Sequence, residues 1–260
     1  MLIKTGHSKK VYYIGNGCVS LELIPNVYSY TYNRCGTVDG TDEIRYKCCE
    51  ILCSLLKSNG INHSYYGYEN GRILSKLILE DGFDPYDLTQ EEKDKLFKFA
   101  PIEVVVKTEH VGTPDHRYYG IGNYKTRFGS VISSKQKYPK PFVRFDWRNP
   151  NNDENGNRLC DEVMSESMAN YYINVEEARI TAESAFNVLK KYMNICGLEL
   201  IDICFFIDQS GKCIFSEISP DCMRVRSVEN KESVDKDIWR AGGSSPLLLE
   251  KWTKFLEMIS

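Results

Sequence analysis

Hydrophobic residues recur along this chain with two different periods. Alternation of apolar and polar residues marks "VYYIGNGCVSLELI", broken at Gly15–Asn16–Gly17, and the later stretches "GRILSKLIL" and "PIEVVVK". This period of two predicts strands, and the first stretch predicts a hairpin because positive φ is cheap at glycine. "LELIDICFFI" and "KCIFSEI" predict a second hairpin, which turns at residues 208–211.

Other stretches have the spacing of helices. In "TDEIRYKCCEILCSLLKSNGI" the apolar positions 44, 48, 51, 52, 55 and 56 predict a helix that stops at Asn59–Gly60. "NVEEARITAESAFNVLKKYMNICG" predicts a long amphipathic helix, and "SPLLLEKWTKFLEMI" predicts a closing one. Thr89 and Glu92 have the spacing of a capping box, which predicts a short helix between two strands.

The stretch from residue 108 to residue 168 shows neither period for long. It is rich in Asn, Asp, Gly, Pro, Arg and Tyr, and it holds only brief strand-like pieces such as "PFVRFDW". Such a segment is typical of a functional surface. The order of the elements predicts an α+β fold with a small β-rich lobe (residues 1–100), a larger lobe of sheet and helices (residues 101–260), and a cleft between them.

Composition narrows the class of protein. With 260 residues, 42% of them hydrophobic, the chain can bury a full core, and its formal charge of −3 provides no basic field for a nucleic-acid polymer. No apolar run reaches the length of a membrane span, and the first residues lack the pattern of a secretory signal. The ten cysteines include no Cys-x-x-Cys pair. Several fall on apolar faces, which predicts reduced, buried thiols in a cytoplasmic protein.

The segment "KCIFSEISPDCMRVRS" places four charged residues behind an apolar run. Arg224 and Arg226 are two apart, so on an extended chain they point the same way and suit a phosphate or carboxylate. Asp202 lies inside the apolar "LELIDICFFI", where a carboxylate is costly to bury without a partner. Two interpretations stay open: an ion-pair network at a sheet edge, or a site that holds an anion.

A second charged segment, "VDKDIWRAGG", precedes the closing helix. Asp237 and Arg240 are three residues apart and can share a helical face, whereas Trp239 points elsewhere. The segment is either an ordinary charged helix face or part of a site. In a site, we expect Asp237 and Arg240 to point toward Arg224, with Trp239 packed into the core.

Two weaker signals complete the candidate chemistry. "GHSKKVY" sets Gly6 and Lys9 before a strand, where backbone amides and a lysine can cradle phosphates, although the P-loop pattern is missing. His110 and His116 share the polar loop "KTEHVGTPDHRYYG". Each is either a solvated loop residue or a residue with a metal or acid–base role.

Taken in order, "GHSKKVYYI", "APIEVVVKTEHVGT", "LELIDICFFI", "FSEISPDCMR" and "DKDIWR" resemble the motifs of SAICAR synthetase, the phosphoribosylaminoimidazole-succinocarboxamide synthase of purine biosynthesis. The resemblance covers nearly the whole chain. It implies the fold of that family and a carbon–nitrogen ligase that joins the carboxylate of an aminoimidazole ribotide to aspartate. The implied cofactors are ATP, which converts the carboxylate into an acyl phosphate, and Mg²⁺, which offsets the charge during transfer.

The resemblance also implies roles for particular residues. It assigns binding of the ribotide to Glu103, Lys107, Thr113, Asp202, Ser219 and Arg224. It assigns catalysis to Asp221, Lys236, Asp237 and Arg240, beside the matching Asp235. It assigns the nucleotide to Gly6 and Lys9, and the metal to Glu217.

The nucleotide side departs from the family pattern. "NVYSYTYN", residues 26–33, stands in place of a glycine-rich loop. Cys204, Phe206 and Ser216 stand in place of the lysine, glutamate and aspartate that would meet ATP and its metal. Neutral or apolar side chains do not neutralise a triphosphate, so the sequence predicts weak or absent binding of Mg-ATP.

Three functions stay open at this point. The first is an amide-forming ligase that acts on a phosphoribosyl-aminoimidazole carboxylate or a similar acidic ribotide, with aspartate or another amine. The second is a diverged paralogue of specialised metabolism that uses the same pocket for different, ATP-independent chemistry. The third is a non-catalytic sensor of a purine intermediate. All three predict small-molecule partners, and they leave homo-oligomer formation open.

Overall fold

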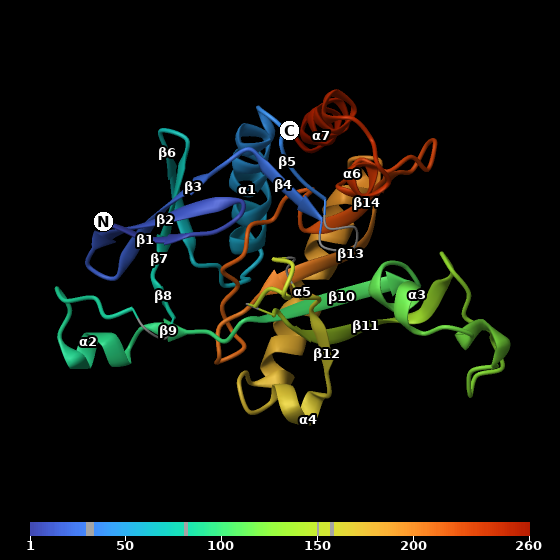
Figure 1. Ribbon diagram of the computed structural model, residues 1–260, viewed down its shortest axis with the longest axis horizontal. Coiled ribbons are helices and arrows are strands. Elements are labelled where there is room, and N and C mark those ends of the chain that lie inside the picture. The colour runs from blue at the N-terminus through green and yellow to red at the C-terminus, as the bar shows by residue number, and fades with distance from the viewer. Residues whose placement is uncertain (30–33, 81–82, 150, 157–158) are drawn as a thin grey trace.

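The computed structural model describes residues 1–260 except 30–33, 81–82, 150 and 157–158, and the side chains of Thr113 and His116 also lie outside the described part. Figure 1 shows the arrangement of its elements. The strands are β1 (Leu2–Thr5), β2 (Lys9–Gly15), β3 (Cys18–Leu23), β4 (Asn26–Ser29), β5 (Arg34–Thr37), β6 (Tyr65–Glu69), β7 (Arg72–Lys76), β8 (Ile78–Leu79), β9 (Phe97–Lys98), β10 (Ile102–Glu109), β11 (Lys137–Trp147), β12 (Glu162–Met164), β13 (Leu198–Phe206) and β14 (Met223–Ser227). The helices are α1 (Thr41–Ser58), α2 (Gln90–Asp94), α3 (Thr113–Arg117), the 3₁₀ turn η2 (Ile121–Asn123), α4 (Glu166–Ala169), α5 (Val175–Ile195), α6 (Asp237–Arg240) and α7 (Ser245–Ile259).

The first sheet has the strand order β1-β2-β3-β7-β6, and all of its neighbouring strands are antiparallel. β2 and β3 form the predicted hairpin. Its turn needs left-handed backbone, which Asn16 adopts at φ 54° between two glycines of positive φ. Two small sheets accompany it, antiparallel β4-β5 and parallel β8-β9.

The second sheet has the order β12-β11-β10-β13-β14 and is also antiparallel. Its register sets Lys107 opposite Asp202, and Asp202 opposite Arg224. Residues directly opposite one another on antiparallel strands point to the same side of a sheet. These three charged residues, on three different strands, therefore share one face.

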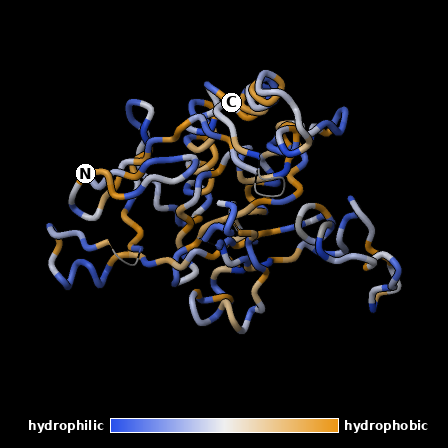
Figure 2. The backbone as a smooth tube through the Cα atoms, in the orientation of Figure 1, coloured by the Kyte–Doolittle hydropathy of each residue, from blue (hydrophilic) through white to orange (hydrophobic). Residues whose placement is uncertain are grey.

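Helix α5 packs against the other face of this sheet, on β10, β11 and β13. That face is apolar, with Val104, Val106, Ile203 and Phe205 fully buried. Helix α1 packs against α5, α7 and the first sheet, so both sheets contribute to one hydrophobic core. Figure 2 shows that the peripheral loops are mainly hydrophilic. None of the helices described here is long and apolar enough to cross a membrane.

The structure confirms the α+β class and most of the predicted elements, and it corrects two of them. "KCIFSEI" is not a strand: Ile214 makes only single bridges, to His63 and to Ile207. It pairs only with the end of β13, where Phe215 N–H donates to Phe206 O at 3.0 Å, because β14 occupies that edge from Leu198 to Ile203. "PFVRFDW" is not a brief piece but part of the eleven-residue β11. The division at residue 100 stays a prediction.

Candidate functional site

Alternation places charged side chains on the face of the second sheet opposite α5. On β10, Lys107 points to this face while its neighbour Val106 is buried in the core. The register adds Asp202 and Arg224 to this face. It also sets Arg144 opposite Val105, which points to the same face as Lys107. We call this surface the charged face of the second sheet. Its charges come from strands that are far apart in the sequence.

Five residues on and above the charged face form a chain of ion pairs, which we call the substrate-side network. Lys107 Nζ lies 2.5 Å from Asp202 Oδ2, and Arg224 Nη1 lies 2.8 Å from the same oxygen. Arg224 Nε donates to Asp237 Oδ2 at 3.0 Å, and Arg240 Nη1 donates to Asp237 Oδ1 at 2.5 Å. Asp237 and Arg240 thus point toward Arg224, and Trp239 is buried, as expected.

The network keeps buried groups ionised. Burial alone opposes the charge on Asp202, but Arg224 and Lys107 outweigh it and hold its pKa well below the usual range. Burial lowers the pKa of Lys107, against the attraction of Asp202. Burial also opposes ionisation of Asp237, while Arg224 and Arg240 lower its pKa. Exposure of the side chains rises along the chain of pairs from 2% at Lys107 to 38% at Asp237, and it is 19% at Arg240. Asp237 is therefore the member of the network most open to solvent.

Gly112 leaves room for the Arg224 side chain, and the sequence pattern did not indicate this role. It has φ 68° and ψ −134°, a conformation that suits glycine. A Cβ at this position would come within 2.8 Å of Arg224 Nη2. The guanidinium therefore lies directly on the backbone of the loop after β10, and a side chain at residue 112 would displace it.

Helix α6 is held in place from two sides. Asp235 accepts hydrogen bonds from the backbone N–H groups of Asp237 and Val225, both at 2.6 Å. Burial, and then the nearby charge of Asp237, raises the pKa of Asp235 to about 7. From the other side, Arg34 of β5 donates to the carbonyl oxygen of Trp239 at 2.6 Å and stacks on its ring at 3.5 Å. Nothing in the sequence pattern indicated Arg34.

Four other predicted residues lie in three separate ion pairs. Lys236 Nζ lies 3.0 Å from Asp221 Oδ1, and this pair is not part of the substrate-side network. Glu103 lies on the charged face, where its carboxylate is 3.6 Å from Arg148 Nη1. Arg226 points the same way along β14 as Arg224, as predicted, and pairs with Glu109 at 2.8 Å.

Glu217 lies in a second group, which we call the Glu217 cluster. Arg45 of α1 donates two hydrogen bonds to the Glu217 carboxylate, from Nε to Oε1 at 2.9 Å and from Nη2 to Oε2 at 2.6 Å. Ser219 Oγ donates to Oε1 at 2.6 Å. Arg45 also donates to the carbonyl oxygens of Ile24 and Ser8, so the cluster joins α1 to the first sheet. Burial opposes the charge on Glu217, but Arg45 dominates and lowers its pKa to about 2.

The predicted nucleotide residues lie next to this cluster. Gly6 N–H donates to Lys9 O at 2.8 Å, which closes the turn between β1 and β2. Burial lowers the pKa of Lys9, whereas the charge of Glu217 raises it. Lys9 and Glu217 are therefore near neighbours, and Lys9 is the one predicted nucleotide side chain that carries charge.

The residues predicted to face the nucleotide make their contacts within the protein. Both oxygens of Glu217 already accept from Arg45. Within the described part of the chain, no group of three or more His, Cys, Asp or Glu residues could hold a metal ion. Burial raises the pKa of the Cys204 thiol well above its ordinary value. The ring of Phe206 lies against Phe215 and under Arg148. Ser216 accepts from the N–H of Phe206 at 3.1 Å.

His110 is not a solvated loop residue. Its side chain is buried, and the loop of residues 133–138 covers it: His110 N–H donates to Gln136 O, and Lys135 N–H donates to His110 O, both at 2.9 Å. Its Nδ1 lies 2.8 Å from Tyr138 Oη, and its Nε2 lies 3.8 Å from Asp115 Oδ1. The sequence left this interpretation open and did not single out Tyr138.

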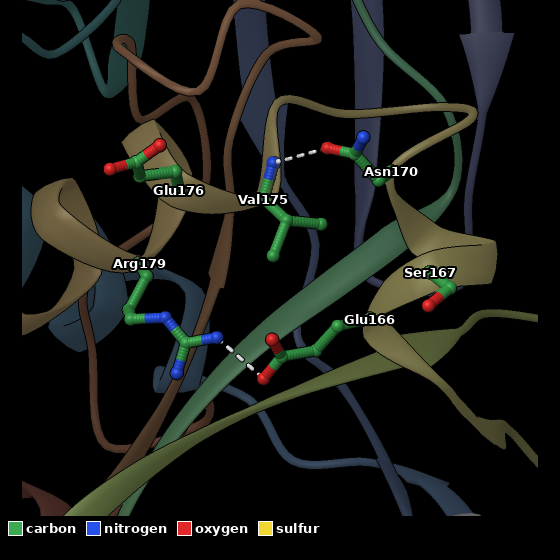
Figure 3. Close-up of a pocket in the computed structure, with 6 residues that line it drawn as sticks. All are labelled: Glu166, Ser167, Asn170, Val175, Glu176 and Arg179. Carbon is green, nitrogen blue, oxygen red and sulfur yellow. Dashed lines mark hydrogen bonds and ion pairs between the residues drawn. The ribbon is translucent and has the colours of Figure 1, made fainter.

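A hollow of about 410 Å³ lies away from both groups, between α4 and the start of α5 (Figure 3). Arg179 reaches across it to Glu166 at 2.5 Å, and Asn170 accepts from the N–H of Val175 at 3.4 Å. Its residues pair with one another, and none of them belongs to the charged face. The predicted site is therefore not this hollow.

Comparisons with known proteins agree on one family. A sequence model described as SAICAR synthetase matches residues 2–258. The chain belongs to the SAICAR synthetase family. It is thus a carbon–nitrogen ligase by family, and the fold is that of the family's solved structures. A SAICAR synthetase "(Type-2) in complex with ADP" is 21% identical over 99% of this chain and 97% of its own, with a TM-score of 0.76. The enzyme from Ehrlichia chaffeensis is 18% identical over 100% and 98%, with a TM-score of 0.78.

Two curated relatives differ in what they are named for. The "Bifunctional cordycepin biosynthesis cluster protein 3" of Cordyceps militaris is 27% identical over 97% of this chain. The chain spans only 32% of that protein's length. The phosphoribosylaminoimidazole-succinocarboxamide synthase of Thermococcus sibiricus is 25% identical over 92% of this chain and 90% of its own.

Proposed function

We propose that this SAICAR synthetase family member joins an amine to the carboxylate of an acidic ribotide, a phosphoribosyl-aminoimidazole carboxylate or a close analogue, and forms an amide. The observation that carries this proposal is the charge balance of the substrate-side network. Its three cations, Lys107, Arg224 and Arg240, outnumber its two carboxylates. A group with excess positive charge and an exposed end favours an anionic ligand. Arg224 is the anchor, since it joins the buried Asp202 to the more exposed Asp237.

The roles within the proposal follow from position. Lys107 and Arg224 bind the anionic part of the ribotide, with Asp202 holding both in place, and Thr113 and Ser219 are further predicted contacts. Asp237 and Arg240, at the exposed end, receive the amine and its carboxylate. Asp221 and Lys236, a partly buried pair, steady the segment that leads into α6.

Dependence on ATP is a property of the family, and for this chain we propose weak affinity for Mg-ATP. Glu217 is occupied by Arg45, so it is a structural group in this proposal rather than a metal ligand. Phe206 and Ser216 offer no carboxylate to a metal. Lys9 is left as the main contact for phosphate.

A second candidate is a member devoted to specialised metabolism, which uses the same ribotide pocket for a different reaction. Two observations favour it: the relative from a cordycepin biosynthesis cluster, and the loss of charge at Cys204, Phe206 and Ser216. The two candidates share the ribotide and differ in the use of ATP and in the partner amine.

Calorimetry with the phosphoribosyl-aminoimidazole carboxylate tests the shared part. Charge-assisted hydrogen bonds are worth about 1.5–3 kcal/mol each, so Arg224→Ala should weaken binding by about ten-fold or more. Arg179→Ala removes a similar ion pair outside the network and should leave the affinity unchanged. Equal affinity in Arg224→Ala and the wild-type protein would contradict the proposed function.

A further inference from the structure

Residues 118–140, which follow α3, form an exposed surface that is both aromatic and basic, and we call them the basic segment. Tyr119 is 87% exposed, Tyr124 is 74% exposed and Phe128 is 72% exposed. The segment contains no aspartate or glutamate, and its charged residues are Lys125, Arg127, Lys135, Lys137 and Lys140. Exposed aromatic side chains that gather in one place mark interaction surfaces, and Tyr, Phe and Arg are enriched in protein–protein interfaces.

The tip of the basic segment is an ordered turn. Thr126 N–H donates to the carbonyl oxygen of Ser130 at 2.7 Å, and Gly129 N–H donates to that of Thr126 at 2.9 Å. The guanidinium of Arg127 lies over the ring of Phe128, 4.7 Å from its centre. None of the segment's residues belongs to the hydrophobic core of the described chain. The tip therefore presents its aromatic side chains outward in a defined arrangement.

The other end of the molecule carries the opposite charge. Residues 84–94, which we call the acidic segment, have one lysine and five exposed carboxylates, which give a net charge of −4: Asp84, Asp87, Glu91, Glu92 and Asp94. Tyr86 lies among them and is 80% exposed. Figure 1 shows the acidic segment around α2 at the left end of the long axis, and the basic segment beyond α3 at the right end. The two ends of one copy are therefore complementary in charge to the two ends of another.

We infer that the chain forms a two-fold homodimer in which the basic segment of each copy binds the acidic segment of the other. Closed two-fold symmetry is the commonest arrangement of homo-oligomers, and every contact across such an interface occurs twice. Because the two segments lie at opposite ends of one axis, two copies packed side by side and antiparallel bring each basic segment to an acidic one. A second copy is the partner because the chain itself supplies the complementary surface.

The dimer is independent of the proposed function. Neither segment contains a residue of the substrate-side network or of the Glu217 cluster. The contact covers Tyr119, Tyr124 and Phe128 on one copy and Tyr86 on the other, which removes aromatic surface from water. Dimer formation can therefore be measured without a ligand, and its failure leaves the proposed ligase reaction untouched.

Sedimentation velocity on the full chain tests the dimer. At low salt and micromolar concentration, the wild-type protein should have a mass of twice 29.9 kDa. Added salt should shift it toward the monomer, because salt screens exposed charges. Tyr124→Ser combined with Phe128→Ser should raise the dissociation constant by about ten-fold or more, since aromatic anchors carry much of the binding energy of an interface. A mass that keeps growing with concentration would indicate an open head-to-tail chain and overturn the two-fold arrangement.

An exchange of charges tests which segments meet. Lys125→Glu combined with Arg127→Glu reverses the tip of the basic segment, and Glu91→Lys combined with Asp94→Lys reverses part of the acidic one. Each double variant alone should be monomeric, because like charges then face one another at both contacts. An equal mixture of the two should form the dimer again, since both contacts then join opposite charges. Melting curves of the separate variants check that each is folded.

The control is Lys47→Glu combined with Lys57→Glu, which makes the same change of charge on the exposed side of α1 and should leave the dimer intact. A monomeric wild-type protein overturns the inference, and so does a dimer that survives both charge reversals. A mixture that stays monomeric overturns the pairing of these two segments. An oligonucleotide or a different protein that binds the monomer at the basic segment would assign the segment to that partner instead.

Discussion

The substrate-side network and the Glu217 cluster are both built from residues that match SAICAR synthetase motifs, yet they differ in what they leave for a ligand. In the network, three cations share two carboxylates, and the outer carboxylate, Asp237, is 38% exposed. In the Glu217 cluster, Arg45 is fully buried and uses both carboxylate oxygens. The substrate-side network can exchange partners with an anion, whereas the Glu217 cluster is a buried structural contact between α1 and the first sheet. A matching motif can therefore become structural once the residues around it change.

The largest effect should come from breaking the exposed end of the network. Asp237→Asn and Arg240→Met should each abolish ribotide binding or turnover, about a hundred-fold or more, because the charge that orients the amine is lost. Melting temperatures should stay nearly unchanged, since the Asp237 side chain is 38% exposed and solvent screens its ion pairs. Assays and melting curves on the same preparations check this. Two active variants would remove Asp237 and Arg240 from the site.

At the buried Glu217 cluster, we expect a mutation to lower stability instead. Arg45→Met leaves the Glu217 carboxylate buried without its partner, which costs about 3–5 kcal/mol. Chemical denaturation should show this loss. Arg72→Met, which breaks an exposed pair with Glu22, is the control and should lose less than about 1 kcal/mol. The double variant Arg45→Met/Glu217→Leu should recover part of the loss. An Arg45→Met protein as stable as the wild type would mean that the Arg45–Glu217 ion pair does not contribute to the free energy of unfolding.

Acid should weaken the same ion pair between Arg45 and Glu217. The pKa of Glu217 in the folded protein, about 2, lies below its ordinary value of 4.5. The pair therefore contributes its full stability above about pH 4.5 and loses it as the pH falls toward 2. Unfolding free energies measured across this range should fall more steeply for the wild-type protein than for Arg45→Met/Glu217→Leu. Parallel curves would assign the acid sensitivity to other carboxylates, such as Asp202.

A smaller effect is expected at the nucleotide side. Wild-type protein should bind Mg-ATP weakly or not at all, and Phe206→Glu combined with Ser216→Asp should strengthen the binding by supplying carboxylates for the metal. Calorimetry with and without Mg²⁺ checks this, and Tyr66→Glu, at an exposed aromatic on the first sheet, is the control. Micromolar affinity in the wild-type protein would contradict the proposal and make the ordinary ligase reaction the leading function.

The smallest effect is expected from reduction of the cysteines. All ten cysteines are free, as predicted, and Cys48, Cys49 and Cys53 lie on the buried face of α1. The melting temperature should be the same with and without dithiothreitol. A large drop on reduction would mean that thiols have oxidised to a bond that stabilises the fold.

The sequence by itself determined the elements whose pattern is local. The apolar spacing of residues 41–60 gave α1, the Thr89–Glu92 box gave α2, and Asn174 capped α5, because these signals act within a few residues. It also placed Asp237 toward Arg224 and Trp239 in the core, since helical geometry alone separates them.

Only the tertiary structure decided which charges meet. Arg45 and Glu217 are 172 residues apart, and Lys107 and Asp202 are 95 apart, so no local pattern links them. "KCIFSEI" has the pattern of a strand but pairs only with the end of β13, because β14 occupies that edge from Leu198 to Ile203. His110 sits in a polar stretch and is buried only because residues 133–138 fold over it. Periodicity sets what a segment can form, whereas the partners available in the folded chain set what its charged side chains do.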